Sequence, residues 1–313
     1  MDTHKIARAV RAPSDTRRNE KPVEWPTLLL LAACYAMWGV SVFIIAGLWL
    51  PGALLLTMVA VALHSSLTHE AVHGHPFRNA TLNEALLFPC LGLAIPYRRF
   101  RDLHLAHHVD SRLTDPYDDP ETHYMDPKVW ADLSAPTRML LRANNTLAGR
   151  LLLGPAIGLI VFWRDEWRAI RAGDRSVRLA WALQVPAVGS VLGILAFSSM
   201  PTWAYLLSCY GALSILKIRT FLEHRAHERA SGRTVVIEDR GPLALIFLNN
   251  NLHAVHHAHP RVAWYDLPGI WAQNREGYLR RNEGYYYRSY GEVFARYFWR
   301  TKEPVAHPLW PQK

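Results

Sequence analysis

Charged residues are scarce in this chain and are missing from two long stretches of it. Only 19% of its 313 residues are Asp, Glu, Lys or Arg, whereas soluble domains usually have about a quarter. Residues 25–69 and 179–216 contain none of these four types, and each stretch is about twice the ~20 residues that cross a bilayer. The alternative, a pair of buried helices in a soluble core, does not suit runs of this length. The sequence therefore predicts membrane-spanning segments.

Cysteine is also rare. Cys34, Cys90 and Cys209 are isolated in apolar sequence and show no paired spacing. This excludes both a disulfide framework and a zinc ribbon. Low-complexity tracts are absent too, and the two apolar stretches are the only repeated feature.

Each charge-free stretch is interrupted near its middle by turn-forming residues, "LPG" at 50–52 and "SSMPT" at 198–202. We therefore expect an all-α membrane protein whose transmembrane helices form two hairpins. Four spans are predicted, near 26–49, 53–73, 179–197 and 202–223. The shorter apolar run at 151–163 cannot span a bilayer and is expected to lie in the interface or to re-enter the membrane.

Basic residues precede the first span, whereas both turns carry no charge. By the positive-inside rule, both termini and the long middle segment are expected to face the cytoplasm, as in a multi-pass protein of a bacterial cytoplasmic membrane. The first span has no small-residue cleavage signature, so it is expected to be retained. The basic residues before it are Lys5, Arg8, Arg11, Arg17, Arg18 and Lys21. The predicted divisions are a basic segment (1–24), a membrane domain (25–270) with a cytoplasmic cap (74–178 and 224–270), and a basic, aromatic segment (271–313).

The net charge of +9 lies almost wholly on the predicted cytoplasmic face. It suits anionic lipid headgroups or an acidic protein partner. Residues 275–300 mix basic and aromatic side chains, but beside a membrane this mixture is more typical of an interfacial belt than of a nucleic-acid site.

Histidine, in contrast, is gathered into short boxes. These are "HEAVH" (69–73), "HLAHH" (104–108) and "HAVHH" (253–257), and "EHRAH" (223–227) adds His224 and His227. Positions three and four apart share one face of a helix, so each box is expected to aim its imidazoles at a common point. A lone HxxxH is weak evidence, but two HxxHH boxes in one chain are far from chance expectation.

The predicted spans bring these boxes to one level. His69 lies ~24 Å and His224 ~33 Å along their helices from the outer turns, at ~1.5 Å per residue. Both therefore reach the cytoplasmic edge of the bilayer, where the other two boxes can cap the same spot. Neutral imidazoles each offer one unprotonated nitrogen to a metal, and iron, zinc and copper all accept it. Nine histidines exceed the four ligands of a zinc site and fit two metals with four or five nitrogens each.

With these residues in hand, the chain resembles the membrane fatty acid desaturase family, whose three histidine boxes match "HEAVH", "HLAHH" and "HAVHH". An additional ligand histidine of the family matches His224 in "RTFLEH", and "HHAHPRVAWYDLP" (256–268) resembles the ending of the third box. The resemblance covers roughly residues 55–270. It implies four spanning helices and a cytoplasmic cap that holds a di-iron centre. The implied ligands are His69, His73, His104, His107, His108, His224, His253, His256 and His257.

The resemblance also implies oxygen-dependent attack on an unactivated C–H bond of a lipid chain. The chain has neither the cysteine set of a ferredoxin-like module nor the heme-binding His-Pro-Gly-Gly segment of a cytochrome b5-like one. A separate ferredoxin or cytochrome b5-type protein is therefore the expected electron donor. We favour desaturation of a fatty acyl chain because the first and third boxes look closest to the acyl desaturases. A hydroxylase, a carotenoid ketolase or an acyl decarboxylase uses the same boxes. A metal transporter is a remote alternative, since it would place ligands near mid-bilayer.

Other polar residues are expected to support the ligands, because a metal-bound histidine usually donates its second N–H to a carboxylate or carbonyl. One or two acids of "LTDPYDDPETHY" (113–124), which includes Glu121, could accept these protons; a solvated turn is the alternative. The residues singled out are Glu70, Asp102, Asp115, Asp118, Asp119, Glu223, Asn249, Asn250 and Asn251. His64 is expected to be a hydrogen-bonded core residue, and His75 and His259 are expected to face solvent. His227, three residues after His224, is the alternative to it as a ligand.

Overall fold

The computed structural model describes residues 23–310, so most of the predicted basic N-terminal segment lies outside the described residues. The described chain is mostly helical. Two-residue strands, β1 (Val236–Ile237) and β2 (Tyr286–Tyr287), pair in parallel. Three helical stretches are long and apolar enough to cross a membrane: Trp25–Leu48, Leu50–Val72 and Arg175–Ala196.

The first charge-free stretch folds into two long helical segments with a tighter turn than expected. Its elements are α2 (Trp25–Val40), a π-helical turn (Ser41–Ile45), α3 (Ala46–Leu48) and α4 (Leu50–Val72). Only Trp49 separates α3 from α4, and Pro51 lies in the first turn of α4. Proline is tolerated there because its missing N–H would have no helical partner anyway. "LPG" therefore begins the second helix rather than forming a loop.

The second charge-free stretch forms α11 (Arg175–Ala196) and α12 (Thr202–Thr220). α12 ends at Thr220, so the span predicted at 202–223 is too long by three residues, and His224 follows outside the helix. Its last turn contains Lys217 and Arg219, which makes α12 less apolar than the three long helices. α12 packs closely on α4, where a Cβ added at Gly211 would come within 2.5 Å of the Met58 sulfur.

An irregular segment, residues 87–96, returns into this helical bundle. Leu91 is fully buried in the same apolar cluster as Tyr205. The Tyr205 hydroxyl donates to the Leu91 carbonyl at 2.8 Å, and the Gln184 amide donates to the Leu93 carbonyl at 2.9 Å. Buried irregular backbone is tolerated only where such partners satisfy it. The hydrogen bonds from Tyr205 and Gln184 therefore explain how this loop can lie among apolar helices.

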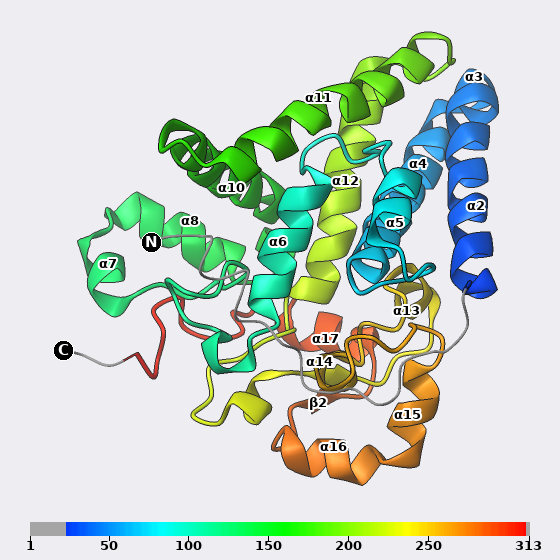
Figure 1. Ribbon diagram of the computed structural model, residues 1–313. Coiled ribbons are helices and arrows are strands. Elements are labelled where there is room, and N and C mark those ends of the chain that lie inside the picture. Colours follow the sequence, from blue (N-terminus) through cyan, green and yellow to red (C-terminus); the bar gives the residue numbers. More distant parts are fainter. Residues whose placement is uncertain (1–22, 311–313) are drawn as a thin grey trace.

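The remaining elements lie beside the long helices, as residues 80–86 and 154–171 do, or around the end of the bundle where α4 and α12 finish, as the helices after α12 do (Figure 1). Before the third long helix these are α5 (Ala80–Leu86), α6 (Tyr97–His107), a 3-10 turn (Asp110–Arg112), α7 (Pro127–Asp132), α8 (Ala135–Asn144), α9 (Leu147–Leu152) and α10 (Gly154–Arg171). After α12 they are a 3-10 turn (Ala230–Arg233), α13 (Pro242–Ile246), α14 (His253–Ala258), α15 (Leu267–Gln273), α16 (Arg275–Arg281) and α17 (Tyr290–Tyr297). Tyr290 and Val293 of α17 pack in one buried cluster with Phe221 and Phe247, so the C-terminal residues belong to the same packed unit.

Candidate metal centre

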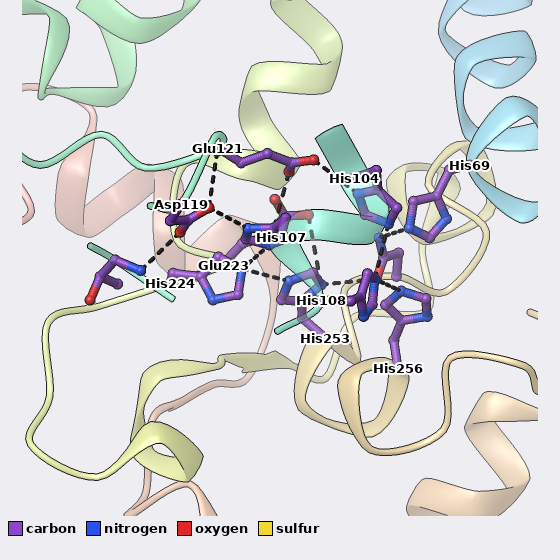
Figure 2. A network of polar contacts seen from close by, with 12 residues as sticks. His69, His104, His107, His108, Asp119, Glu121, Glu223, His224, His253 and His256 are labelled. Carbon is purple, nitrogen blue, oxygen red and sulfur yellow. Dashed lines mark hydrogen bonds and ion pairs between the residues drawn. The ribbon is translucent and has the colours of Figure 1, made fainter. Parts of the chain in front are cut away.

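The structure brings all nine predicted histidines together and divides them into two adjacent groups. Figure 2 labels members of both groups. Within each group, one nitrogen from every residue lies within 4.8 Å of the others. The five-histidine centre contains His69, His73, His104, His108 and His256. The four-histidine centre contains His107, His224, His253 and His257.

The two HxxHH boxes are each split between these centres. In the second box His104 and His108 enter the five-histidine centre, whereas His107 enters the other. In the third box the assignment is reversed, because only His256 joins the five-histidine centre. The expectation that each box aims at one common point is therefore wrong for both. Residues i and i+4 lie about 40° apart around a helix of 3.6 residues per turn, but i+3 and i+4 lie about 100° apart.

Helix ends position eight of the nine side chains. His69 and His73 lie at the end of α4, with His73 as the C-cap. α6 carries the second box, and the six-residue helix α14 begins at the first histidine of the third box. His224 is different because it follows the end of α12 and forms an isolated β-bridge with Thr234.

Two carboxylates fix the orientation and the tautomer of two ligand rings. The Nδ1 atom of His104 lies 2.9 Å from Glu121 Oε1, and the Nδ1 atom of His107 lies 2.7 Å from Asp119 Oδ1. An ionised carboxylate only accepts hydrogen bonds, so each Nδ1 must carry the proton. The Nε2 atom of a neutral ring is then left with a bare lone pair that faces into the centre.

These lone pairs face ring nitrogens of other histidines, and a neutral ring has only one N–H to donate. His104 Nε2 lies 3.0 Å from the Nε2 atoms of both His73 and His108. His224 Nε2 lies 2.8 Å from that of His107 and 3.0 Å from that of His253. Hydrogen bonds alone cannot satisfy several converging acceptors, whereas a metal cation in each centre can. The donor set therefore fits two metals held by histidine nitrogen.

The electrostatics of the described cap residues agree with this arrangement. Burial lowers the pKa of His224, His253 and His256 well below the usual value, and neighbouring histidines lower these pKa values further. Burial also acts to lower the pKa of His107, but the carboxylates of Glu121 and Asp119 outweigh it and raise this pKa to about 9. Burial thus keeps these three rings neutral, as metal ligands must be. Asp119 and Glu121 supply negative charge beside His107, whose second proton a metal cation would displace on binding.

Three further candidates also lie beside ligand rings. Asn250 Oδ1 accepts from His253 Nδ1 at 3.0 Å, and its amide nitrogen lies 3.4 Å from His69 Nε2 in the other centre. A carboxylate oxygen of Glu70 lies 3.6 Å from His69 Nδ1, and one of Glu223 lies 3.8 Å from His253 Nδ1. Both separations exceed hydrogen-bond length, so these two acids act on the rings mainly through charge.

The other candidates make their contacts elsewhere. Asp102 pairs with Arg101 at 2.8 Å. Asp115 accepts the backbone N–H groups of the turn that follows it, and Asp118 is exposed. Asn249 donates to a backbone carbonyl of the segment after α14, and Asn251 donates to the carbonyls of residues 237 and 239. Asp115, Asn249 and Asn251 therefore support loop backbone rather than imidazoles, and Asp102 pairs within α6.

The histidines outside the two centres have their own partners. His64 Nε2 lies 3.2 Å from the Tyr35 hydroxyl inside the bundle, in keeping with a core role. His227 forms an ion pair with Glu283 at 3.2 Å and lies outside both centres. His75 was expected to face solvent, but it is buried against Glu24 with a shortest distance of 2.7 Å. That expectation is wrong because the start of α2 lies over the loop that follows the first box.

Sequence reasoning gave too little weight to Glu121 and did not identify Tyr124 or Lys302. Glu121 follows Asp119 by two residues in the acidic segment after the second box, so its position was a usable signal. Lys302 donates from its ammonium to the His224 carbonyl at 2.6 Å. No local motif marks a lysine that is distant in sequence from its partner.

Comparison with protein-family models matches residues 46–290 to the fatty acid desaturase model. The matched range covers most of the chain and contains all nine histidines. Comparison with curated proteins gives no match.

Proposed function

Because this chain belongs to the fatty acid desaturase family, we propose that it is a membrane oxidoreductase that introduces a double bond into a fatty acyl chain. Two irons would be held by the five- and four-histidine centres. The observation that carries this proposal is the convergence of nine imidazole nitrogens in two adjacent groups. When bound, the irons would supply oxygen-dependent removal of hydrogen from an unactivated carbon, which no side chain of this protein can perform.

The protein's own groups prepare that chemistry. Asp119 and Glu121 hold the Nδ1 protons of His107 and His104, so that the Nε2 atoms stay free for metal. Asn250 holds His253 in the same way. Five of the nine ligand histidines are buried and four are half-buried, which limits the access of water and favours reaction with a lipid chain over side reactions.

The proposed arrangement in the membrane has four spans, with α12 as the fourth, and both termini in the cytoplasm. α12 packs against α4 within the bundle, which supports this role despite its lower hydropathy. The cap would comprise residues 74–178 and 224–270, completed by the C-terminal residues that pack on it. A cysteine introduced at Ser199, in the turn between α11 and α12, should react with a membrane-impermeant reagent only from outside. Reaction only from the cytoplasmic side would contradict this topology.

A separate acidic redox protein of the ferredoxin or cytochrome b5 type would supply electrons. Exposed arginines of α16, Arg280 and Arg281, support docking at the end of the molecule opposite the turn between α11 and α12 (Figure 1). Docking between opposite charges weakens as salt rises. Turnover at a subsaturating concentration of the donor should therefore fall as ionic strength rises. Turnover that does not change with salt would contradict electrostatic docking.

Product analysis tests the reaction itself. The protein is expressed in a host with defined fatty acids, and lipids are analysed by mass spectrometry under labelled oxygen. A new acyl double bond without incorporated label supports desaturation. Labelled hydroxyl or keto products, or a shortened terminal alkene, would assign the chain to another reaction of the same family, because both outcomes begin with removal of one hydrogen and then depend on fine placement.

A further inference from the structure

The C-terminal strap, residues 301–310, follows the last helix and is tied to the cap at both ends. The Lys302 N–H donates to the Asn145 carbonyl at 3.2 Å. Farther along, the Met125 N–H donates to the Val305 carbonyl at 2.9 Å, and the His307 N–H donates to the Met125 carbonyl at 2.8 Å. The strap lies beyond the residues that match the family, so the match assigns it no role.

The first contact of the strap with the four-histidine centre is made by Lys302. Its ammonium donates to the backbone carbonyl of His224 at 2.6 Å, a charge-assisted hydrogen bond. His224 is the one predicted ligand that neither a helix nor a helix cap carries, because α12 already ends at Thr220. Lys302 therefore fixes backbone that a helix would otherwise have fixed.

The second contact is made by His307 through the acid loop, residues 113–126. His307 Nε2 lies 3.3 Å from the Thr114 hydroxyl, and the Thr114 N–H donates to Asp119 Oδ2 at 2.8 Å. The other oxygen of Asp119 holds His107 Nδ1. Thr114 has a φ of 70°, a left-handed conformation that a β-branched residue rarely adopts without support from its surroundings.

Tyr124 joins these two contacts. Its ring centroid lies 5.0 Å from that of His307 and 6.0 Å from the Lys302 ammonium. Its hydroxyl accepts the backbone N–H of Ala226, two residues after His224, at 2.8 Å. The acid loop, the His224 segment and the strap therefore meet at one buried aromatic side chain.

We propose that the strap is a working part of the four-histidine centre, in which Lys302 and His307 are positioning residues for His224 and for the Asp119–His107 pair. This inference rests on the proposed function, since it assumes that the centre holds a metal. Lys302 has no hydrogen bond to the five-histidine centre among residues 23–310. Loss of the Lys302 ammonium should therefore weaken one centre selectively.

The test uses the full chain in detergent and measures iron affinity and iron content. Lys302→Met keeps the length of the side chain and should lower the iron affinity of the four-histidine centre about 10-fold. This is the lower end of the usual effect of residues that support metal ligands. Lys302→Arg should restore most of the affinity. Arg138→Met is the matched control, because Arg138 also donates to a backbone carbonyl, that of Ala131 at 3.1 Å, but lies on α8 outside both centres.

Ligand variants show which centre responds. In a His69→Ala/His73→Ala background, which retains the four-histidine centre, Lys302→Met should weaken the remaining iron site about 10-fold. In a His224→Ala background, Lys302→Met should change iron binding no further, because coupled residues are not additive. If Lys302→Met weakened iron binding equally in both backgrounds, or left it unchanged in both, the inference would be overturned.

Hydrogen exchange of the metal-free protein tests whether Lys302 holds the His224 segment and the acid loop in place. In Lys302→Met, residues 222–226 and the acid loop should exchange faster together, while α4 and α14 keep their wild-type rates. Unchanged exchange in both segments would overturn the inference even if iron binding changed. A wild-type chain that binds no iron, or only one, would instead contradict the proposed function, and the exchange data would still decide whether the strap holds His224.

Discussion

The two histidine centres share two helices but are built differently. Ligands of the five-histidine centre come from the ends of α4 and α6 and from α14, all helices or their caps. The four-histidine centre shares α6 and α14, but its remaining ligand, His224, is held by a β-bridge to Thr234 and by Lys302. One centre is therefore positioned mainly by local helical structure and the other partly by contacts between distant segments. The shared helices tie the geometry of the two centres together.

The largest expected effect comes from variants that leave three ligands in one centre. His69→Ala/His73→Ala reduces the five-histidine set to three, and His224→Ala does the same to the four-histidine set. Each should lower iron from about two to about one per chain and abolish turnover, because the reaction needs both metals. Metal analysis and product detection by mass spectrometry provide the measurements. Loss of both irons in either variant would show that the centres cannot fill independently.

A smaller difference is expected between the two supporting acids. The Asp119 side chain is 1% exposed, whereas that of Glu121 is 30% exposed, so water can replace Glu121 more easily. Asp119→Ala should lower the iron affinity of the four-histidine centre about 100-fold. Glu121→Ala should lower that of the five-histidine centre about 10-fold. These values are the two ends of the usual range for residues that support metal ligands. Iron titration of both variants provides the comparison. The reverse order would mean that burial does not govern this support.

Asn250 should have a weaker effect, because its hydrogen bond to His253 is not charge-assisted. Such a bond contributes about 1 kcal/mol, so Asn250→Leu should weaken iron binding at the four-histidine centre roughly 5-fold. Titration in the His69→Ala/His73→Ala background isolates this centre. An effect as large as that of Asp119→Ala would show that the Asn250 amide does more than hold one ring.

The smallest effect on metal is expected at a buried histidine outside both centres. His75→Leu leaves the Glu24 carboxylate buried without its imidazole, which should cost about 3 kcal/mol of stability and lower Tm. Iron content should stay at about two per chain, because His75 belongs to neither centre. Thermal unfolding and metal analysis on the same preparation separate the two properties. A parallel loss of iron would place the α2–His75 contact in the support of the first box.

Much of the site could be predicted because its signals are local. The spacing of the boxes identified eight of the nine histidines that come together, and "RTFLEH" identified His224. The long charge-free stretches identified helices that can cross a membrane. The end of α12 could not be placed, since apolar residues continue past Thr220 and only tertiary contacts show where the helix stops. His75 was misjudged for a similar reason, because its partner Glu24 lies on another helix end.

The sequence by itself determined which residue types gather and where apolar helices run, because spacing along a helix and charge along the chain are properties of neighbouring residues. The tertiary structure decided how the nine histidines divide into two centres and what holds each one. His104 and His253 open identical HxxHH patterns yet face different centres, because α6 and α14 approach from different directions. Lys302 and His307 support ligands from far along the chain, and no pattern of neighbouring residues encodes a contact that only folding creates.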